Sequence, residues 1–275
     1  MDFSFTLWDV EHGLSIWIQT PSGQNHCIDA GHNSETDFSP FERMKNFYKV
    51  NNIDYLIISH PDKDHIEGLP NFIKYLDKPK TFTRNKTLPY EMKYGSCDKE
   101  YQKIFKNLDS TYIYPVSAEK SPKNEQNNGN VKVYCYMNTY HNNMKCNDTS
   151  IVVIYKYKNW VFICPGDIEP TGWESLKRNY AKEISEIINK ATIILVAPHH
   201  GRPSAYCNDM IDFLHPNLIL ISDKYGKHIT APQYYICASG IPYGGSTIKS
   251  LSTKTKGRIR ISIDETGNAF LNTAS

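Results

Sequence analysis

Residues 55–69 read YLIISHPDKDHIEGL, and this stretch decides the fold and the chemistry that we expect. An apolar run of strand length ends at His60, and Asp62, Asp64 and His65 follow before a predicted helix. Four such side chains could hardly be buried together without compensation, and divalent cations supply it by binding imidazole nitrogen and carboxylate oxygen. The alternative is a solvated acidic helix start, in which Asp62 and Asp64 favour the helix dipole.

Two later apolar runs also end in potential ligands. In FICPGDIEP, residues 162–170, an apolar strand is followed by Gly166 and Asp167. A carboxylate in this place is suited to bridge two cations, although Gly-Asp after a strand is also a common turn. ILVAPHHGRPSAY contains His199 and His200, of which we expect one to bind metal and the other to pack or to contact substrate, with His199 slightly favoured. The predicted metal ligands are therefore His60, Asp62, Asp64, His65, Asp167 and His199, with Asp64 also assigned to catalysis.

Composition excludes several classes of protein. The 275 residues carry 31 Lys plus Arg against 29 Asp plus Glu, so the whole chain is not a polycation that coats nucleic acid. The sequence contains no run of about 18 apolar residues and does not open with a secretory leader pattern. Its seven cysteines form no C-x-x-C pair. We therefore expect a cytoplasmic protein with reduced thiols.

Strand-like and helix-like segments alternate in two sets, and each set opens with strands and contains an apolar run that ends in histidine. This pattern predicts an α/β fold in which helices enclose two β-sheets, an αββα sandwich, rather than a doubly wound parallel sheet. We expect one domain over residues 1–275. Residues 77–130, rich in Lys, Asn, Tyr and Pro, are expected to form an irregular insertion with one helix around CDKEYQKIFKNL.

The order SHPDKDH, PGD, PHHG resembles the metallo-β-lactamase superfamily, and more narrowly the hydrolase domain of ComEC-type DNA-uptake proteins and their stand-alone relatives. The resemblance extends over WDVEHGLSIWIQTPSGQNHCIDAG, NDTSIVVIYKYKNWVFICPGDIE, ISDKYGKHITAP and RISIDETGNAFL. It implies the metallo-β-lactamase fold, two divalent metal ions, and phosphodiester hydrolysis by a metal-bound hydroxide.

The chain departs from the superfamily pattern at two places. Asp62 stands where the commonest signature, His-x-His-x-Asp-His, has its second histidine. The third histidine of the first metal has no clear counterpart, because Asn147 and Asp148 stand where it is expected, and His141 substitutes only if its loop folds back. More oxygen ligands make that site harder, so Mn²⁺ rivals Zn²⁺ there.

The resemblance also indicates residues around the metals. Asp29 is expected to orient a ligand histidine or a loop amide rather than to bind metal itself, and His200 is the alternative to His199. His228 either contacts a phosphate oxygen or protonates the leaving group, or it is an exposed loop histidine. Ser204 and Lys227 are candidates for substrate contacts.

A basic stretch near the end of the chain indicates a polymer substrate. Lys254 and Lys256 are expected to share one face of a strand, as are Arg258 and Arg260, and such a face could follow a phosphate backbone. A sheet edge protected by lysine explains the same pattern. The ComEC-type resemblance, joined to this local basic excess, implies nucleic acid as the substrate, with single-stranded DNA favoured. The alternatives are a hydrolase of small esters, lactones or cyclic nucleotides, and a binding module that has lost catalysis.

Overall fold

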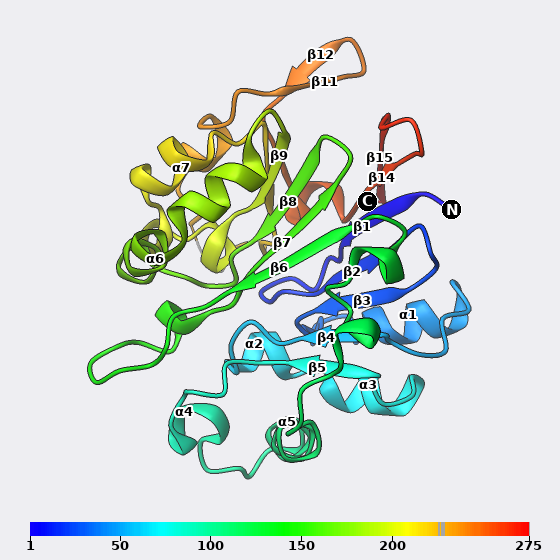
Figure 1. Ribbon diagram of the computed structural model, residues 1–275, viewed down its shortest axis with the longest axis vertical. Helices are drawn as coiled ribbons and strands as arrows, with labels where there is room; N and C mark the ends of the chain where they lie inside the picture. Colours follow the sequence, from blue (N-terminus) through cyan, green and yellow to red (C-terminus); the bar gives the residue numbers. More distant parts are fainter. Residues whose placement is uncertain (225, 227–228, 275) are drawn as a thin grey trace.

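Two β-sheets form the centre of the structure, a computed structural model that describes residues 1–224, 226 and 229–274 (Figure 1). Across these residues the first sheet has seven strands in the order β15-β14-β1-β2-β3-β4-β5. Its strands are β1 (Phe3–Leu7), β2 (Ile16–Gln19), β3 (Asn25–Ile28), β4 (Tyr55–Ile57), β5 (Thr81–Thr83), β14 (Arg258–Ile263) and β15 (Ala269–Ala274).

The second sheet, within the same described residues, has six strands in the order β13-β10-β9-β8-β7-β6. Its strands are β6 (Lys132–Tyr136), β7 (Val152–Tyr157), β8 (Trp160–Cys164), β9 (Thr192–Val196), β10 (Leu218–Ile221) and β13 (Ser250–Ser252). A separate hairpin of β11 (Ile241–Tyr243) and β12 (Ser246–Ile248) projects from one end of the molecule (Figure 1).

Helices flank both sheets, and short 3-10 turns connect several strands. The helices are α1 (Pro40–Asn46), α2 (Lys63–Ile66), α3 (Leu69–Tyr75), α4 (Tyr90–Tyr94), α5 (Glu100–Thr111), α6 (Pro170–Ile188), α7 (Asn208–Leu214) and α8 (Thr253–Lys256). The 3-10 turns are η1 (Ala118–Lys120), η2 (Glu125–Asn128), η3 (Asn147–Thr149), η4 (Pro198–Gly201), η5 (Pro203–Ala205) and η6 (Pro232–Tyr235).

Three apolar clusters define four layers. Alternate residues of both sheets, such as Phe5 on β1 and Phe162 on β8, pack against each other between the sheets, with ring centroids 4.8 Å apart. On the outer face of the second sheet, α6 buries Trp173 and Leu176, one helical turn apart, against β8 and β9. Helices α1, α3 and α5 cover the outer face of the first sheet in the same way. The predicted α/β sandwich of two sheets enclosed by helices is confirmed.

Two segments differ from the sequence-based expectations. Residues 77–130, expected to be irregular, contain the edge strand β5 and two helices, and Phe105 and Leu108 of α5 are buried in the outer core of the first sheet. Lys254 and Lys256 lie in helix α8, so the expectation that they share one face of a strand is wrong. The short helix fits between Ser252, its N-cap, and Gly257, whose φ of 59° allows the chain to turn into β14.

Among the described residues, no helix has both the length and the apolar character that crossing a bilayer requires.

Candidate metal centre

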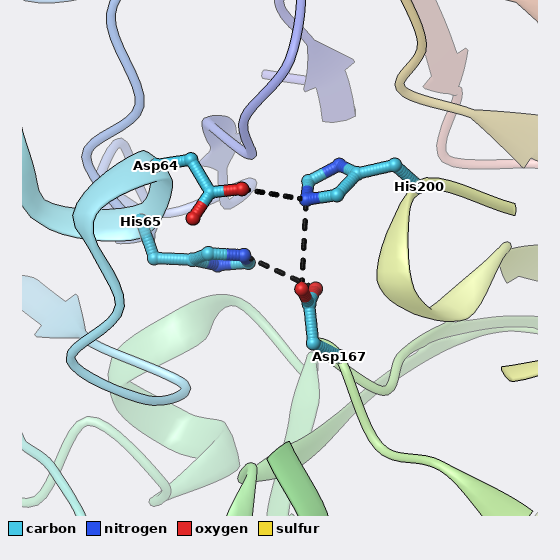
Figure 2. Close-up of side chains that lie close together, drawn as sticks. All are labelled: Asp64, His65, Asp167 and His200. Carbon is cyan, nitrogen blue, oxygen red and sulfur yellow. Dashed lines mark ion pairs between the residues drawn. The ribbon is translucent and has the colours of Figure 1, made fainter. Parts of the chain in front are cut away.

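Several strands of the two sheets end at a common edge, and the loops after them carry the predicted ligands. His60 follows β4, Asp64 and His65 lie in α2, Asp167 follows β8, and His200 lies in the η4 turn after β9. Figure 2 shows Asp64, His65, Asp167 and His200 pointing toward one another from three different loops. One ligand atom from each of these four lies within 4.8 Å of those of the other three. The two sheets thus bring together residues that are more than 100 positions apart.

The close approach of two loops requires a glycine. Gly166 has a φ of +59°, and a Cβ atom there would lie 2.9 Å from Cβ of Ser59. Only glycine therefore lets the loop of Asp167 pass beside the Ser59–His60 loop. A larger residue would push Asp167 away from the histidines that surround it.

Asp167 is the centre of the cluster. Its Oδ1 atom lies 3.1 Å from Nε2 of His65, and its Oδ2 atom lies 3.6 Å from Nε2 of both His199 and His200. His60 approaches the same Oδ2 atom at 3.9 Å. Asp64 completes the group, because its Oδ2 lies 3.3 Å from Nε2 of His200. Both oxygens of this carboxylate thus face imidazole nitrogens, an arrangement that suits a ligand of a metal site.

A buried network holds His65 in place from behind. Oδ2 of Asp29 lies 2.7 Å from Nδ1 of His65 and also accepts a hydrogen bond of 2.7 Å from the Ser59 hydroxyl. The second oxygen of Asp29 accepts from the backbone N–H of Ser59 at 2.6 Å. Asp29, which the sequence predicted to orient a ligand rather than to bind metal, therefore lies behind a histidine of the cluster.

The pKa shifts reflect strong coupling in the cluster. Burial alone would lower the pKa of His65, but the carboxylates of Asp167 and Asp29 outweigh it and raise this pKa well above its ordinary value. Burial alone would raise the pKa of Asp167, but positive charge on His65 and His200 keeps it well below its ordinary value. The site thus favours carboxylate anions that face cationic partners.

The chemistry of the donor set fits a divalent metal. Nε2 of His60, His65 and His200 and Oδ1 of Asp167 are buried, and among the described residues none makes a hydrogen bond of normal geometry, although Nε2 of His65 faces Oδ1 of Asp167 at 3.1 Å. Buried polar atoms are seldom left without a partner in proteins, and several that face one point indicate a ligand. Two carboxylates and two imidazoles suit Zn²⁺ and Mn²⁺. The cluster therefore supports metal binding.

A second group of ligands lies beside His60. Nε2 of this residue is 3.6 Å from Oδ2 of Asp62 and 3.9 Å from Oδ2 of Asp167, which belongs to the first group. Cys146 lies next to Asp62, and burial, followed by the charge of Asp62, raises the pKa of its thiol. No pattern in the sequence indicates Cys146, because an isolated cysteine before Asn147 is not a recognisable ligand motif.

His199 and His200 have different surroundings. Both have positive φ, 50° and 57°, which is uncommon outside glycine and asparagine and turns both rings toward the site. His200 belongs to the four-residue cluster, whereas Nε2 of His199 accepts a hydrogen bond of 2.9 Å from Arg202. Burial, more than any other cause, lowers the pKa of His199. The sequence favoured His199 as the ligand; the geometry favours His200 for the position beside Asp64.

Other predicted site residues lie farther from the cluster. Asn147 contacts Nδ1 of His199 at 3.4 Å, and Asp148 accepts a hydrogen bond from the backbone of Gly172 at the start of α6. His141 and Ser204 are exposed, and no contact joins either to the cluster among the described residues. Lys227 and His228 lie outside the described residues.

The basic stretch divides into two parts. Lys254 is 3.7 Å from Asp223, and Lys256 is exposed. Arg258 and Arg260 alternate with buried isoleucines on β14, so they share the outer face of the first sheet as predicted. Arg260 lies over the rings of Trp17 and Tyr48, at 5.2 and 5.5 Å from their centroids.

A cleft of about 270 Å³ opens above the cluster. Its lining includes two residues that the sequence analysis did not single out, His12 after β1 and Arg202 after η4. The sequence does contain a signal for His12. It lies in VEHG, directly after the first predicted strand, just as SHPDKDH, PGD and PHHG each follow a predicted strand. The remaining lining residues are Val10, Glu11, His32, Ser34, Asp62, Lys63, Asp64, Glu67, Asp167, His199 and Lys224.

Comparisons with known proteins give structural likenesses at low sequence identity. No protein-family model matches the chain, and no curated protein matches it by sequence. A diphosphatase of the PhnP family is similar with a TM-score of 0.43 at 12% identity, over 95% of this chain and 99% of the other. A protein of Parabacteroides distasonis assigned as a metal-dependent hydrolase has a TM-score of 0.47 at 11% identity, over 91% of this chain and 93% of the other. Yeast long-form RNase Z has a TM-score of 0.45 at 11% identity, over 93% of this chain and 41% of the other.

Proposed function

We propose that the chain is a metal-dependent hydrolase of the metallo-β-lactamase fold that cleaves phosphodiester bonds in nucleic acid, with DNA favoured. The observation that carries this proposal is the convergence of Asp64, His65, Asp167 and His200, whose buried ligand atoms include several that make no hydrogen bond of normal geometry among the described residues. Such a cluster at the base of an open cleft has no comparably good structural explanation. Six side chains would hold two ions: His60, Asp62, Asp64, His65, Asp167 and His200.

The residues have distinct tasks in this proposal. Asp167 would be shared by both ions, His60 and Asp62 would bind on one side, and Asp64, His65 and His200 on the other. Two bound divalent ions supply an activated water and neutralise charge that develops on the phosphoryl oxygens. Asp29 keeps Nδ1 of His65 protonated, so that Nε2 remains available as a ligand. His228, outside the described residues, stays our candidate for protonating the leaving group, with Ser204 and Lys227 as candidate substrate contacts.

The basic residues support a nucleic-acid substrate. Lys254, Lys256 and Arg258 are at least partly exposed on a nearly neutral chain, and their side chains can contact phosphates without sequence preference. The ComEC-type resemblance of the motifs favours DNA.

A second candidate function is hydrolysis of a small phosphoester, ester or lactone. The volume of the cleft favours it, because about 270 Å³ lies below the 300 to 1,000 Å³ that is typical of pockets for larger small molecules. An unpaired strand or a chain end fits a cleft of this size more readily than a duplex does.

One experiment separates these functions. Wild-type protein and the Asp167→Ala variant are incubated with labelled single-stranded DNA, duplex DNA, RNA, a chromogenic phosphodiester and a lactone, each with Mn²⁺ or Zn²⁺. We expect the wild type to cleave single-stranded DNA and the chromogenic phosphodiester, and the variant to cleave neither. A wild type that opens the lactone and leaves every phosphodiester intact would show that the nuclease proposal is wrong.

A further inference from the structure

Arg202 is held at the mouth of the metal cluster by two histidines. Its Nη1 atom lies 2.9 Å from Nε2 of His199, and its Nη2 atom lies 2.9 Å from Nε2 of His12. These histidines come from two different loops of the cleft lining, one after β1 and one after β9. The guanidinium therefore links these two loops, and its orientation is fixed at two points.

Each of the two histidines also touches a carboxylate of the cluster. Nε2 of His12 lies 3.3 Å from Oδ2 of Asp64, and Nε2 of His199 lies 3.6 Å from Oδ2 of Asp167. The guanidinium is thus one side chain away from both carboxylates that would hold metal. A group bound to Arg202 would lie directly beside the reacting centre.

The hydrogen-bond chemistry fixes the charge of this arrangement. An arginine guanidinium only donates hydrogen bonds and does not lose its proton in proteins. Both imidazoles must therefore accept through Nε2, which leaves them neutral with the proton on Nδ1. Neutral acceptors orient the guanidinium without cancelling its positive charge. A guanidinium carries five N–H groups in one plane, and this geometry matches phosphoryl oxygens, often in pairs.

The two lysines in the same cleft are held differently. Lys224 lies 2.8 Å from Glu11 and also pairs with Glu35, and Lys63 lies 3.4 Å from Glu67. Carboxylates therefore offset the charges of both lysines. Arg178, on α6 and outside the lining of this cleft, is largely exposed, so a substitution there removes the same charge without reaching the cleft.

We propose that Arg202 is the anchor for the phosphoryl oxygens of the substrate, and that His12 is the positioning residue that holds Arg202 in place. This inference rests on the proposed phosphodiesterase function and narrows it: the substrate class is an anionic phosphoester rather than a neutral ester or lactone. Arginine is the residue best suited to such a task, because its fork matches two phosphate oxygens.

Binding of inorganic phosphate to the metal-loaded full chain tests the anchor without catalysis. We expect Arg202→Gln to weaken phosphate binding, measured by calorimetry, by about 10- to 100-fold, which corresponds to the loss of charged hydrogen bonds. Arg202→Lys keeps the positive charge but loses the planar fork of N–H groups. Its affinity for phosphate should therefore lie between those of the wild type and Arg202→Gln. Arg178→Gln, the matched control, should change phosphate binding by less than about threefold. Metal content, measured by mass spectrometry, should be equal in all four proteins.

Kinetics with a chromogenic phosphodiester test the positioning role of His12. His12→Leu removes the acceptor and should raise KM about tenfold with a smaller effect on kcat. His12→Gln offers an amide oxygen in place of Nε2 and should recover most of this loss. A residue that only supported the fold would not show this recovery.

The outcomes separate the anchor from the proposed function. If the wild type cleaves phosphodiesters but Arg202→Gln binds phosphate as the wild type does, the anchor is wrong and the proposed function stands. If Arg202→Gln loses metal, Arg202 builds the metal site and the anchor is equally wrong. If the wild type cleaves no phosphodiester yet loses phosphate binding on Arg202→Gln, the proposed function fails and the anchor stands.

Discussion

Nδ1 of His65 lies 2.7 Å from Oδ2 of Asp29, and neither side chain is exposed to solvent. The carboxylate therefore fixes which nitrogen of His65 faces Asp167. We predict that Asp29→Asn lowers metal affinity by about 10- to 100-fold, as is typical when the hydrogen-bond partner of a ligand histidine is lost. Competition with a chromophoric chelator measures this change.

The matched control for Asp29 is Asp54→Asn. Asp54 is also a buried carboxylate that accepts hydrogen bonds, from Asn25 and Lys80, but it lies outside the cluster. Asp54→Asn should leave metal affinity unchanged. Equal losses in both variants would mean that general destabilisation, not orientation of His65, explains the effect.

The neighbouring histidines should behave differently when each is removed. We predict that His200→Ala retains less metal after dialysis than His199→Ala, because His200 belongs to the four-residue cluster while His199 accepts from Arg202. Mass spectrometry gives the metal content, and circular dichroism confirms that both variants are folded. Equal loss of metal from both proteins would contradict this division.

Metal preference should follow the donor atoms. We predict that Mn²⁺ supports activity at least as well as Zn²⁺, since Asp62 supplies oxygen beside His60 where a nitrogen ligand would favour zinc. Reconstitution of stripped protein with each metal is the measurement. Asp62→His should shift the preference toward Zn²⁺, and strict dependence of the wild type on Zn²⁺ would be the opposite result.

Two arginines on β14 should differ in their effect on stability. Arg260 lies over Trp17 and donates to Ser4 and Gln19, so we predict that Arg260→Ala lowers the free energy of unfolding by roughly 1–3 kcal/mol. Arg258→Ala, at a more exposed contact with Asn272, should change it by less than about 0.5 kcal/mol. Urea unfolding measures both. Tests of DNA binding by charge reversal should therefore leave Arg260 unchanged, and equal effects of the two variants would refute this distinction.

His26 should make the protein sensitive to acid. Burial lowers its pKa from 6.5 to about 4, and the charge of Asp54 opposes this only in part. Between these two values the unfolded chain binds a proton that the folded chain does not, so stability falls as the pH falls through this interval. The loss should reach roughly 2–4 kcal/mol at pH 4.

Free energies of unfolding at pH 7 and pH 5 check this prediction. His26→Phe removes the titrating group and should flatten the pH dependence, although it also loses the contact with the Tyr155 hydroxyl at 3.0 Å. The two proteins are therefore compared by the change in their free energy of unfolding between pH 7 and pH 5, not by its absolute value. An unchanged slope would show that other groups cause the acid sensitivity.

The sequence predicted the layers and most of the cluster for one physical reason. Apolar strands that end in polar residues place those residues at a sheet edge, and His60, Asp64, His65 and Asp167 all follow this rule. The choice between adjacent histidines could not be predicted, because it depends on two residues of positive φ in a turn. The contact of His12 with Arg202 joins residues 190 positions apart. No local pattern reports such a contact.

The strand order also bears on how the chain folds during synthesis. In the first sheet β1 pairs with β14, so that Phe3 lies opposite Ile263. One of the two hydrogen-bonding edges of β1 therefore stays unpaired until residues 258–263 have left the ribosome. An exposed strand edge readily pairs with other chains, and long-range strand pairing forms slowly. Nascent chains that stall or terminate before Arg258 should accordingly depend on chaperones to stay soluble.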